Sequence, residues 1–160
     1  MKDRLVYMKQ LIFFLLLFLS SLPGITQSED ALRKKHFNIE NEIALQGYDP
    51  VSYFLAGPVK GSSSFACVYK GITYHFSSDK NLQLFKASPA KYEPAYGGWC
   101  AYAMGNSGEK VEIDPRTYKI TNGKLYLFYN FYFTNTLTKW NADENNLRTK
   151  ADQYWIKLYK

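Results

Sequence analysis

The N-terminal segment is the feature that most limits what this chain can fold into. Three basic residues occur among the first nine, and an unbroken apolar run follows at residues 11–19. A positive flank and about nine apolar residues are typical of a secretory signal peptide, and the run is too short to span the ~30 Å core of a bilayer. Thr26 and Ser28 are small residues at the third and first positions before a cut after Ser28. We therefore expect residues 1–28 to be removed and the protein to be secreted or periplasmic; the alternative is an uncleaved membrane anchor.

The chain that remains is of single-domain size and mildly basic. About 130 residues can bury one hydrophobic core. After residues 1–28 are removed, 17 Lys and Arg stand against 13 Asp and Glu, a net charge of +4. Because these charges form no Lys/Arg block, we expect no nucleic-acid binding, no basic membrane-surface patch and no stable membrane insertion after cleavage. Residues 29–42 are polar and predict a loose lead-in with at most a short helix, ahead of a domain over residues 43–160.

Two hairpins are predicted from turn residues between strand-like runs. In residues 65–77 the turn falls at Lys70-Gly71, and residues 117–127 turn at Asn122-Gly123. In the first hairpin, alternation places Cys67 and His75 on opposite faces. The expected pairs are Tyr69 with Ile72, Cys67 with Tyr74 and Phe65 with Phe76 on the core face, and the second hairpin turns Tyr118, Ile120, Leu125 and Leu127 inward.

Helices are predicted around these hairpins. Asp49 and Pro50 are suited to the start of a short helix over residues 49–56, and Ser78 to the cap of a helix that ends near Ala87. A further short turn is expected over residues 89–92. The tail has helical spacing at Phe133, Leu137 and Trp140, and again at Leu147, Ala151, Tyr154, Trp155 and Leu158. The fold class is therefore α+β, a small single domain with two β-hairpins packed against short helices and a C-terminal helix.

Several short motifs follow one another between residues 43 and 156. They are Gly47-Tyr48-Asp49-Pro50-Val51, Tyr74-His75-Phe76-Ser77, Phe85, Pro89, Lys91-Tyr92, Tyr96-Gly97-Gly98-Trp99-Cys100-Ala101, Asp114-Pro115, Lys124-Leu125-Tyr126-Leu127, Ala151-Asp152 and Trp155. In this order they resemble the YHS domain family, and more narrowly its exported single-domain branch.

The same resemblance bears on metal binding. YHS modules that handle metals carry one cysteine after Asp-Pro-Val and two in a Phe-Cys-x-x-x-Cys arrangement, and the matching positions here are Ser52, Ser77 and Asn81. Hydroxyl and amide groups are poor ligands for thiophilic metals. We therefore predict no cofactor and favour no metal site. The alternative is copper or zinc handling through Cys100 with Met104 and His75, because soft sulfur ligands suit Cu(I).

Cys67 and Cys100 are the two cysteines of the chain. Export favours a disulfide between them, which would stabilise the fold by roughly 3–4 kcal/mol in the chain-entropy model. Two buried free thiols are the alternative. Cys100 also follows Gly-Gly-Trp and is placed to begin a short helix, which would lower its thiol pKa. Thiol-based redox chemistry at Cys100 therefore stays open, with His75 as the available base.

Aromatic residues with polar tips gather in two of the motifs. Such residues commonly line small-molecule sites, although a small domain also fills its core with them. The candidate ligand-binding residues are Tyr48, Asp49, Tyr53, Tyr96, Gly97, Gly98, Trp99, Cys100 and Tyr102. The sequence thus favours an exported, non-enzymatic binding domain whose partner is an unknown small molecule or protein.

Overall fold

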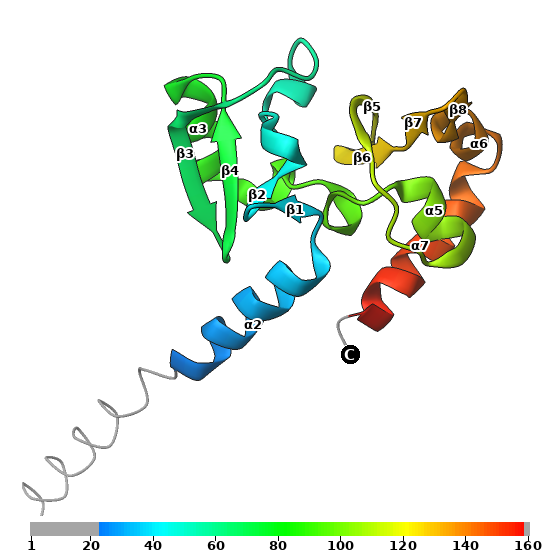
Figure 1. The fold of residues 1–160 in the computed structure, drawn as a ribbon, viewed down its shortest axis with the longest axis horizontal. Helices are drawn as coiled ribbons and strands as arrows, with labels where there is room; N and C mark the ends of the chain where they lie inside the picture. Colours follow the sequence, from blue (N-terminus) through cyan, green and yellow to red (C-terminus); the bar gives the residue numbers. More distant parts are fainter. Residues whose placement is uncertain (1–22, 159–160) are drawn as a thin grey trace, which may run out of the picture.

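A computed structural model of the protein describes residues 23–158, and Figure 1 shows two groups of strands lying side by side with helices around them. The predicted signal peptide lies mostly outside the described residues. The predicted cut after Ser28 falls inside helix α2 (Pro23–His36). Within residues 23–158, no helix is long and apolar enough to cross a membrane.

For residues 29–42 the sequence predicts a loose lead-in with at most a short helix. Most of this segment belongs to α2, and a tight hairpin of β1 (Ile39–Glu40) and β2 (Ile43–Ala44) follows. Arg33 and His36, near the C-terminal end of α2, and Phe37, directly after it, are buried. These three side chains fix a helix that is otherwise polar, and such a helix has no apolar stripe by which the sequence could reveal it.

The first sheet has the strand order β1-β2-β4-β3. Strands β3 (Ser62–Tyr69) and β4 (Ile72–Phe76) form the predicted hairpin, and β2 adds in parallel through Ile43 and Thr73. The predicted pairs of Tyr69 with Ile72 and of Cys67 with Tyr74 are confirmed. The predicted pair of Phe65 with Phe76 is wrong, because a register shift between Ser62 and Ala66 places Ser62 opposite Phe76.

Helices cover the inner face of this sheet. The predicted helix after Ser78 is α3 (Asp79–Ala87), whose first turn is capped because the Ser78 hydroxyl accepts from the Asn81 amide at 3.2 Å. It is followed by α4 (Pro89–Tyr92). The Phe85 ring packs at 4.8 Å from Tyr74 and 5.1 Å from Phe76, and this group is the centre of the first core. Before β3, the helix predicted over residues 49–56 is only a 3₁₀ turn, η2 (Ser52–Phe54), and another, η1 (Leu45–Gly47), precedes it.

The second hairpin forms as predicted from β5 (Asp114–Thr121) and β6 (Lys124–Phe128), with Ile120 opposite Leu125. Both faces of β6 are buried. Leu125 and Leu127 join the first core, whereas Tyr126 and Phe128 face a second core that contains Met104 and Trp140. A strand between two cores holds the two halves of the domain together.

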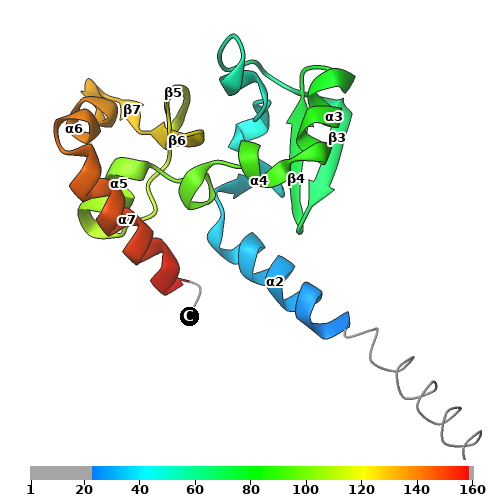
Figure 2. The ribbon, with the colours of Figure 1, turned by 180° about the vertical axis from the view of Figure 1, so that it is seen from behind.

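The second core is closed by helices. Figure 2 shows α5 (Ala101–Ser107) lying against α7 (Glu144–Leu158). A Cβ atom built on Gly105 would lie 2.4 Å from the Leu147 carbonyl oxygen, so only glycine permits this approach. The predicted tail helices are α6 (Thr136–Ala142) and α7, but Phe133 lies outside α6, in the turn between β7 (Asn130–Phe131) and β8 (Thr134–Asn135). The remaining turn, η3 (Ala95–Gly98), links the two halves. The predicted fold class, a small α+β domain, is confirmed.

Candidate functional site

Asp49 is the centre of a buried polar network. Its side chain is fully buried, and one carboxylate oxygen accepts from the backbone amides of Val51 at 2.8 Å and Ser52 at 3.3 Å. The other oxygen accepts from the Ser77 amide at 2.9 Å, the Ser77 hydroxyl at 2.7 Å and the Asn81 side-chain amide at 2.6 Å. A buried carboxylate needs such donors, because without them its desolvation would be very costly.

This network brings together the three positions that are cysteine in metal-handling YHS modules. Ser77 and Asn81 share one oxygen of Asp49, and the Ser52 hydroxyl donates to the Asp49 carbonyl at 2.7 Å. Their donor hydrogens therefore point at Asp49. Among the described residues, no group of three or more His, Cys, Asp or Glu side chains is placed to hold a metal ion. The residues present do not fit a thiophilic metal, and their arrangement stabilises the turn at Asp49 instead.

The nine candidate ligand-binding residues do not form one site. Tyr53 is in the core, where its hydroxyl donates to the Pro115 carbonyl at 2.8 Å and burial raises its pKa far above the usual range. Tyr48 lies 4.8 Å below the ammonium of Lys60. Asp49 is enclosed by its own hydrogen-bond donors. The three candidates between Tyr48 and Tyr53 therefore stabilise the fold.

The candidates between Tyr96 and Tyr102 lie in several different places. Tyr96 and Gly97 line a cleft that is described below. The carbonyl of Gly98 accepts from Asn38, and the indole of Trp99 donates to the His36 carbonyl at 2.7 Å. Tyr102 lies in a different surface hollow.

Cys100 is enclosed by protein. Its sulfur is fully buried, 3.4 Å from the Thr136 hydroxyl and 3.4 Å from the Tyr129 backbone nitrogen. Met104 is equally buried one turn further along α5. His75 lies elsewhere, in a small surface pocket beside Gly47 and Lys60. The structure thus does not bring His75 to Cys100 as a base or a fellow ligand.

The disulfide predicted between Cys67 and Cys100 is not formed, and both residues are free thiols. Cys67 is half-buried on β3, opposite Tyr74, and burial raises the pKa of its thiol. The Cys100 sulfur instead contacts Thr136 and Tyr129.

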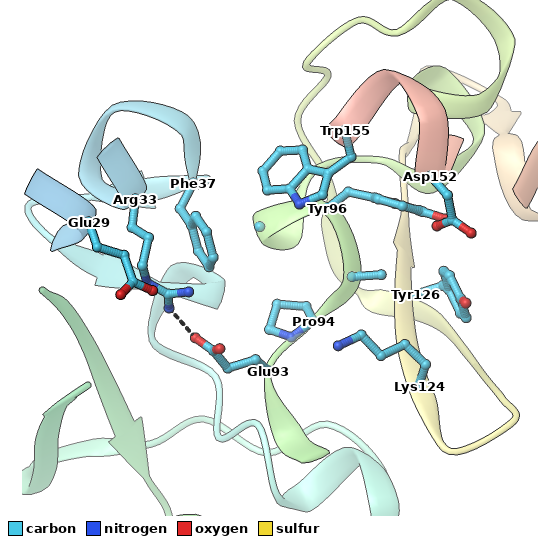
Figure 3. Close-up of a pocket in the computed structure, with 12 residues that line it drawn as sticks. Glu29, Arg33, Phe37, Glu93, Pro94, Tyr96, Lys124, Tyr126, Asp152 and Trp155 are labelled. Carbon is cyan, nitrogen blue, oxygen red and sulfur yellow. Dashed lines mark hydrogen bonds and ion pairs between the residues drawn. The ribbon is translucent and has the colours of Figure 1, made fainter. Parts of the chain in front are cut away.

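A cleft of about 430 Å³ opens between α2, η3, β6 and α7, and Figure 3 shows the side chains around it. We call it the α2–α7 cleft. Its walls combine aromatic rings with charged groups from segments far apart in the sequence. The lining residues are Glu29, Arg33, Phe37, Glu93, Pro94, Ala95, Tyr96, Gly97, Lys124, Tyr126, Asp152 and Trp155.

The aromatic wall depends on Gly97. This residue has a φ of +60°, and a Cβ atom on it would lie 2.7 Å from the Trp155 ring and 3.0 Å from Phe37. Without a side chain there, the Trp155 ring packs edge-on at 5.9 Å from Phe37 and 6.4 Å from Tyr96. The first glycine of the Gly-Gly-Trp motif therefore shapes the cleft.

One side of the cleft is tied together by an ion pair. Glu93 accepts from the Arg33 guanidinium and from the Tyr74 hydroxyl, the latter at 2.5 Å. Arg33 also donates to the Lys70 carbonyl at 3.1 Å and stacks 4.2 Å from the centre of the Phe37 ring. Burial, and then the charge of Glu93, raise the pKa of Tyr74 well above its usual range, so its hydroxyl remains a proton donor.

The other side of the cleft holds Asp152 and Lys124. Asp152 accepts from the Tyr96 hydroxyl at 2.9 Å, and burial followed by this carboxylate raises the pKa of Tyr96 far above its usual range. Lys124 has no hydrogen-bond or ion-pair partner among residues 23–158. In Figure 3 its ammonium end points into the cleft, toward Pro94. The cleft therefore offers a cation that none of the described side chains neutralises.

The sequence contained a signal for part of this cleft. Lys124, Tyr126, Asp152 and Trp155 all lie in the motifs that carry the family resemblance. Arg33 had no such signal, because it lies in the segment expected to be loose.

Fold and site together define a small α+β domain with an aromatic-lined cleft and a buried Asp49 network. The family model for the YHS domain matches residues 56–96. The resemblance to the YHS domain family that the motifs indicate is therefore confirmed over residues 56–96. The match extends from the end of η2 to Tyr96, so it includes Ser77, Asn81 and one wall of the cleft. No curated protein and no solved structure gives a significant match.

Proposed function

We propose that this protein is an exported, non-enzymatic YHS-type binding domain whose α2–α7 cleft holds a small ligand with a flat apolar part and an anionic group. The observation that carries the proposal is the Lys124 ammonium, which faces an aromatic-walled cleft without an ion-pair partner in the described chain. A carboxylate or phosphate would supply that partner through a charge-assisted hydrogen bond.

The rest of the cleft supports the same ligand class. Its volume of about 430 Å³ suits a small molecule, and aromatic walls with a few polar groups are typical of such sites. The rings of Phe37, Tyr96 and Trp155 offer apolar surface for a flat group. Asp152 engages Tyr96 through one oxygen, which leaves the other for an N–H or O–H of the ligand.

Binding is favoured over catalysis because the ionisable groups of the cleft other than Lys124 make contacts within the fold. Glu93 serves Arg33 and Tyr74, and no histidine or cysteine is among the lining residues. The alternatives of copper handling and thiol redox chemistry at Cys100 gain no supporting contact, since its sulfur is fully buried.

The binding test is a titration of the processed protein with simple aromatic acids, benzoate and indole-3-acetate, and with phenyl phosphate, followed by tryptophan fluorescence and thermal shift. We expect saturable binding that Lys124→Gln weakens about tenfold or more, the cost of losing a charge-assisted hydrogen bond. Lys80→Gln on the exposed side of α3 is the control and should bind as wild type. No binding of any of these probes, or unchanged affinity in Lys124→Gln, would contradict the proposal.

Export is tested separately. The apolar run at residues 11–19 and the small residues at Thr26 and Ser28 support cleavage after Ser28. N-terminal sequencing of the protein from its own compartment should then begin at Glu29. Full-length protein recovered from the membrane fraction would show that the segment is not removed.

A further inference from the structure

Three consecutive aromatic residues are exposed at the turn between β7 and β8. Phe131 is 41% exposed, Tyr132 90% and Phe133 111%. The Phe131 ring still contacts Tyr129, with ring centres 5.1 Å apart, whereas Tyr132 and Phe133 extend beyond it. Single exposed apolar residues are ordinary on protein surfaces, but a contiguous apolar group indicates contact with another apolar phase.

The backbone of this turn is strained to present these side chains. Tyr132 and Phe133 have φ values of +50° and +62°, in the left-handed region that bulky residues disfavour. Three other two-residue hairpin turns in the described chain adopt the same geometry. Their central residues are Asn41-Glu42, Lys70-Gly71 and Asn122-Gly123, each with the Asn or Gly that this turn type prefers. The turn at Tyr132-Phe133 has neither Asn nor Gly, so the needs of the fold do not explain its residues. Backbone strain of this kind clusters at functional sites.

Two exposed cations lie on elements next to the turn. Of the four basic residues between positions 115 and 142, Lys119 is paired with Glu144 and Lys124 faces the α2–α7 cleft, which leaves Arg116, paired with the nearly buried Asp114, and Lys139. The Asn130 side chain donates to the Thr117 hydroxyl at 2.9 Å, which fixes β7 against β5 next to the largely exposed Arg116. Lys139 is exposed on α6, which directly follows β8. Figure 1 shows β7, β8 and α6 at the end of the molecule away from β3 and α2.

We infer that the β7–β8 turn is a peripheral membrane-contact site that places Tyr132 and Phe133 at the headgroup level of an anionic lipid surface. Aromatic side chains, and tyrosine with its polar tip, favour this boundary, and nearby cations favour anionic headgroups. A projecting tip of a few rings suits a fluid interface, because it needs no complementary pocket. A search for Lys/Arg blocks misses such a site, since the aromatic rings supply most of the contact and the cations are dispersed.

The test is co-sedimentation of the processed soluble protein with vesicles of phosphatidylcholine and phosphatidylglycerol at 7:3, against pure phosphatidylcholine. We expect a bound fraction on the anionic vesicles that falls at least about fivefold in Tyr132→Asn/Phe133→Gly. This variant supplies the residues that the turn prefers, so its thermal stability should equal or exceed that of wild type, and lost binding cannot then be ascribed to unfolding. Val68→Thr, a change at an exposed apolar residue on β3, is the matched control and should bind as wild type.

Two results would overturn the inference. One is equal sedimentation of wild type and the Asn-Gly variant, whether both bind or neither does. The other is a concentration-dependent dimer on size exclusion that the Asn-Gly variant abolishes without a change in vesicle binding, because the turn would then be a contact between two copies of the chain.

Discussion

The side-chain amide of Asn81 donates to the buried carboxylate of Asp49 at 2.6 Å, across 32 residues of sequence. This bond joins the turn before β3 to the first turn of α3.

Asp49→Asn should destabilise the domain. The change replaces one acceptor oxygen by an NH₂ group, which would face donors from Ser77 and Asn81 or from the backbone of Val51 and Ser52. We expect a loss of about 2–4 kcal/mol in the free energy of unfolding, since buried donors lose a charged acceptor. Urea denaturation measures this, with exposed Glu109→Gln as the charge-matched control. A loss below that of the control would mean that the network contributes nothing to stability.

The convergence of Ser52, Ser77 and Asn81 predicts that cysteines restored there would gather around one point. The triple variant Ser52→Cys/Ser77→Cys/Asn81→Cys should therefore bind Co²⁺ with thiolate-to-metal charge-transfer bands, because thiolates are strong ligands for such metals. Wild type and the single variant Asn81→Cys are the comparisons. If the triple variant binds no better than Asn81→Cys while its circular dichroism is native, the three positions do not form a common site.

Gly105→Ala should separate α5 from α7. Its new Cβ atom would meet the Leu147 backbone at 2.4 Å, a contact that a main-chain oxygen cannot relieve by rotating. We expect a loss of about 1–3 kcal/mol, typical of overpacking, and a lower melting temperature by calorimetry. Ser107→Ala, an exposed site on the same helix, should change stability little. Equal melting temperatures would show that the two helices can shift at no cost.

Local signals predicted the parts of the fold that depend on neighbouring residues. The turns at Lys70-Gly71 and Asn122-Gly123, and the cap at Ser78, depend on residue type within a few positions, and all three are confirmed. The register shift before Ala66 could not be predicted, because the three serines that open β3 have no apolar side chain to set its pairing. For β6 the sequence predicts one buried face. The structure buries both, because helices distant in the sequence pack against Tyr126 and Phe128.

The candidate site was harder to predict, because its residues come from segments far apart in the sequence. The sequence selected Tyr96 and Gly97 of the cleft, which lie in one motif. The partners that make the cleft come from α2, β6 and α7, and the ion pair of Arg33 with Glu93 spans 60 residues. Nothing in the local pattern of α2 distinguishes a buried arginine from a solvated one.

The stability of the domain should fall below pH 6.5 because of His36. Burial, and then the charges of Lys110 and Lys35, hold its pKa below the usual value of about 6.5. A histidine with a lowered folded pKa takes up its proton first in the unfolded state, so its contribution is complete above 6.5 and is lost as the pH falls from there. NMR titration should give a pKa below 6.5 that rises in Lys110→Met, since the Lys110 ammonium lies 3.1 Å from the His36 ring. In His36→Gln, stability should depend less on pH between 7 and 5; an unchanged slope would exclude His36 as the cause.

The ion pair of Arg33 and Glu93 should anchor α2 to the domain. Both side chains are nearly buried, at 10% and 12% exposure, so removing the guanidinium leaves the buried Glu93 carboxylate without its cation and with the Tyr74 hydroxyl still donating to it. Arg33→Met should therefore cost about 3–5 kcal/mol. Adding Glu93→Gln removes the unpaired charge but keeps an acceptor for Tyr74, so the double variant should recover part of that loss. Urea denaturation of the four proteins gives the coupling energy, which we expect to exceed about 1.5 kcal/mol. Strictly additive losses would show that the two residues stabilise α2 independently, with Arg33 acting through its other contacts, such as those with Phe37 and Lys70.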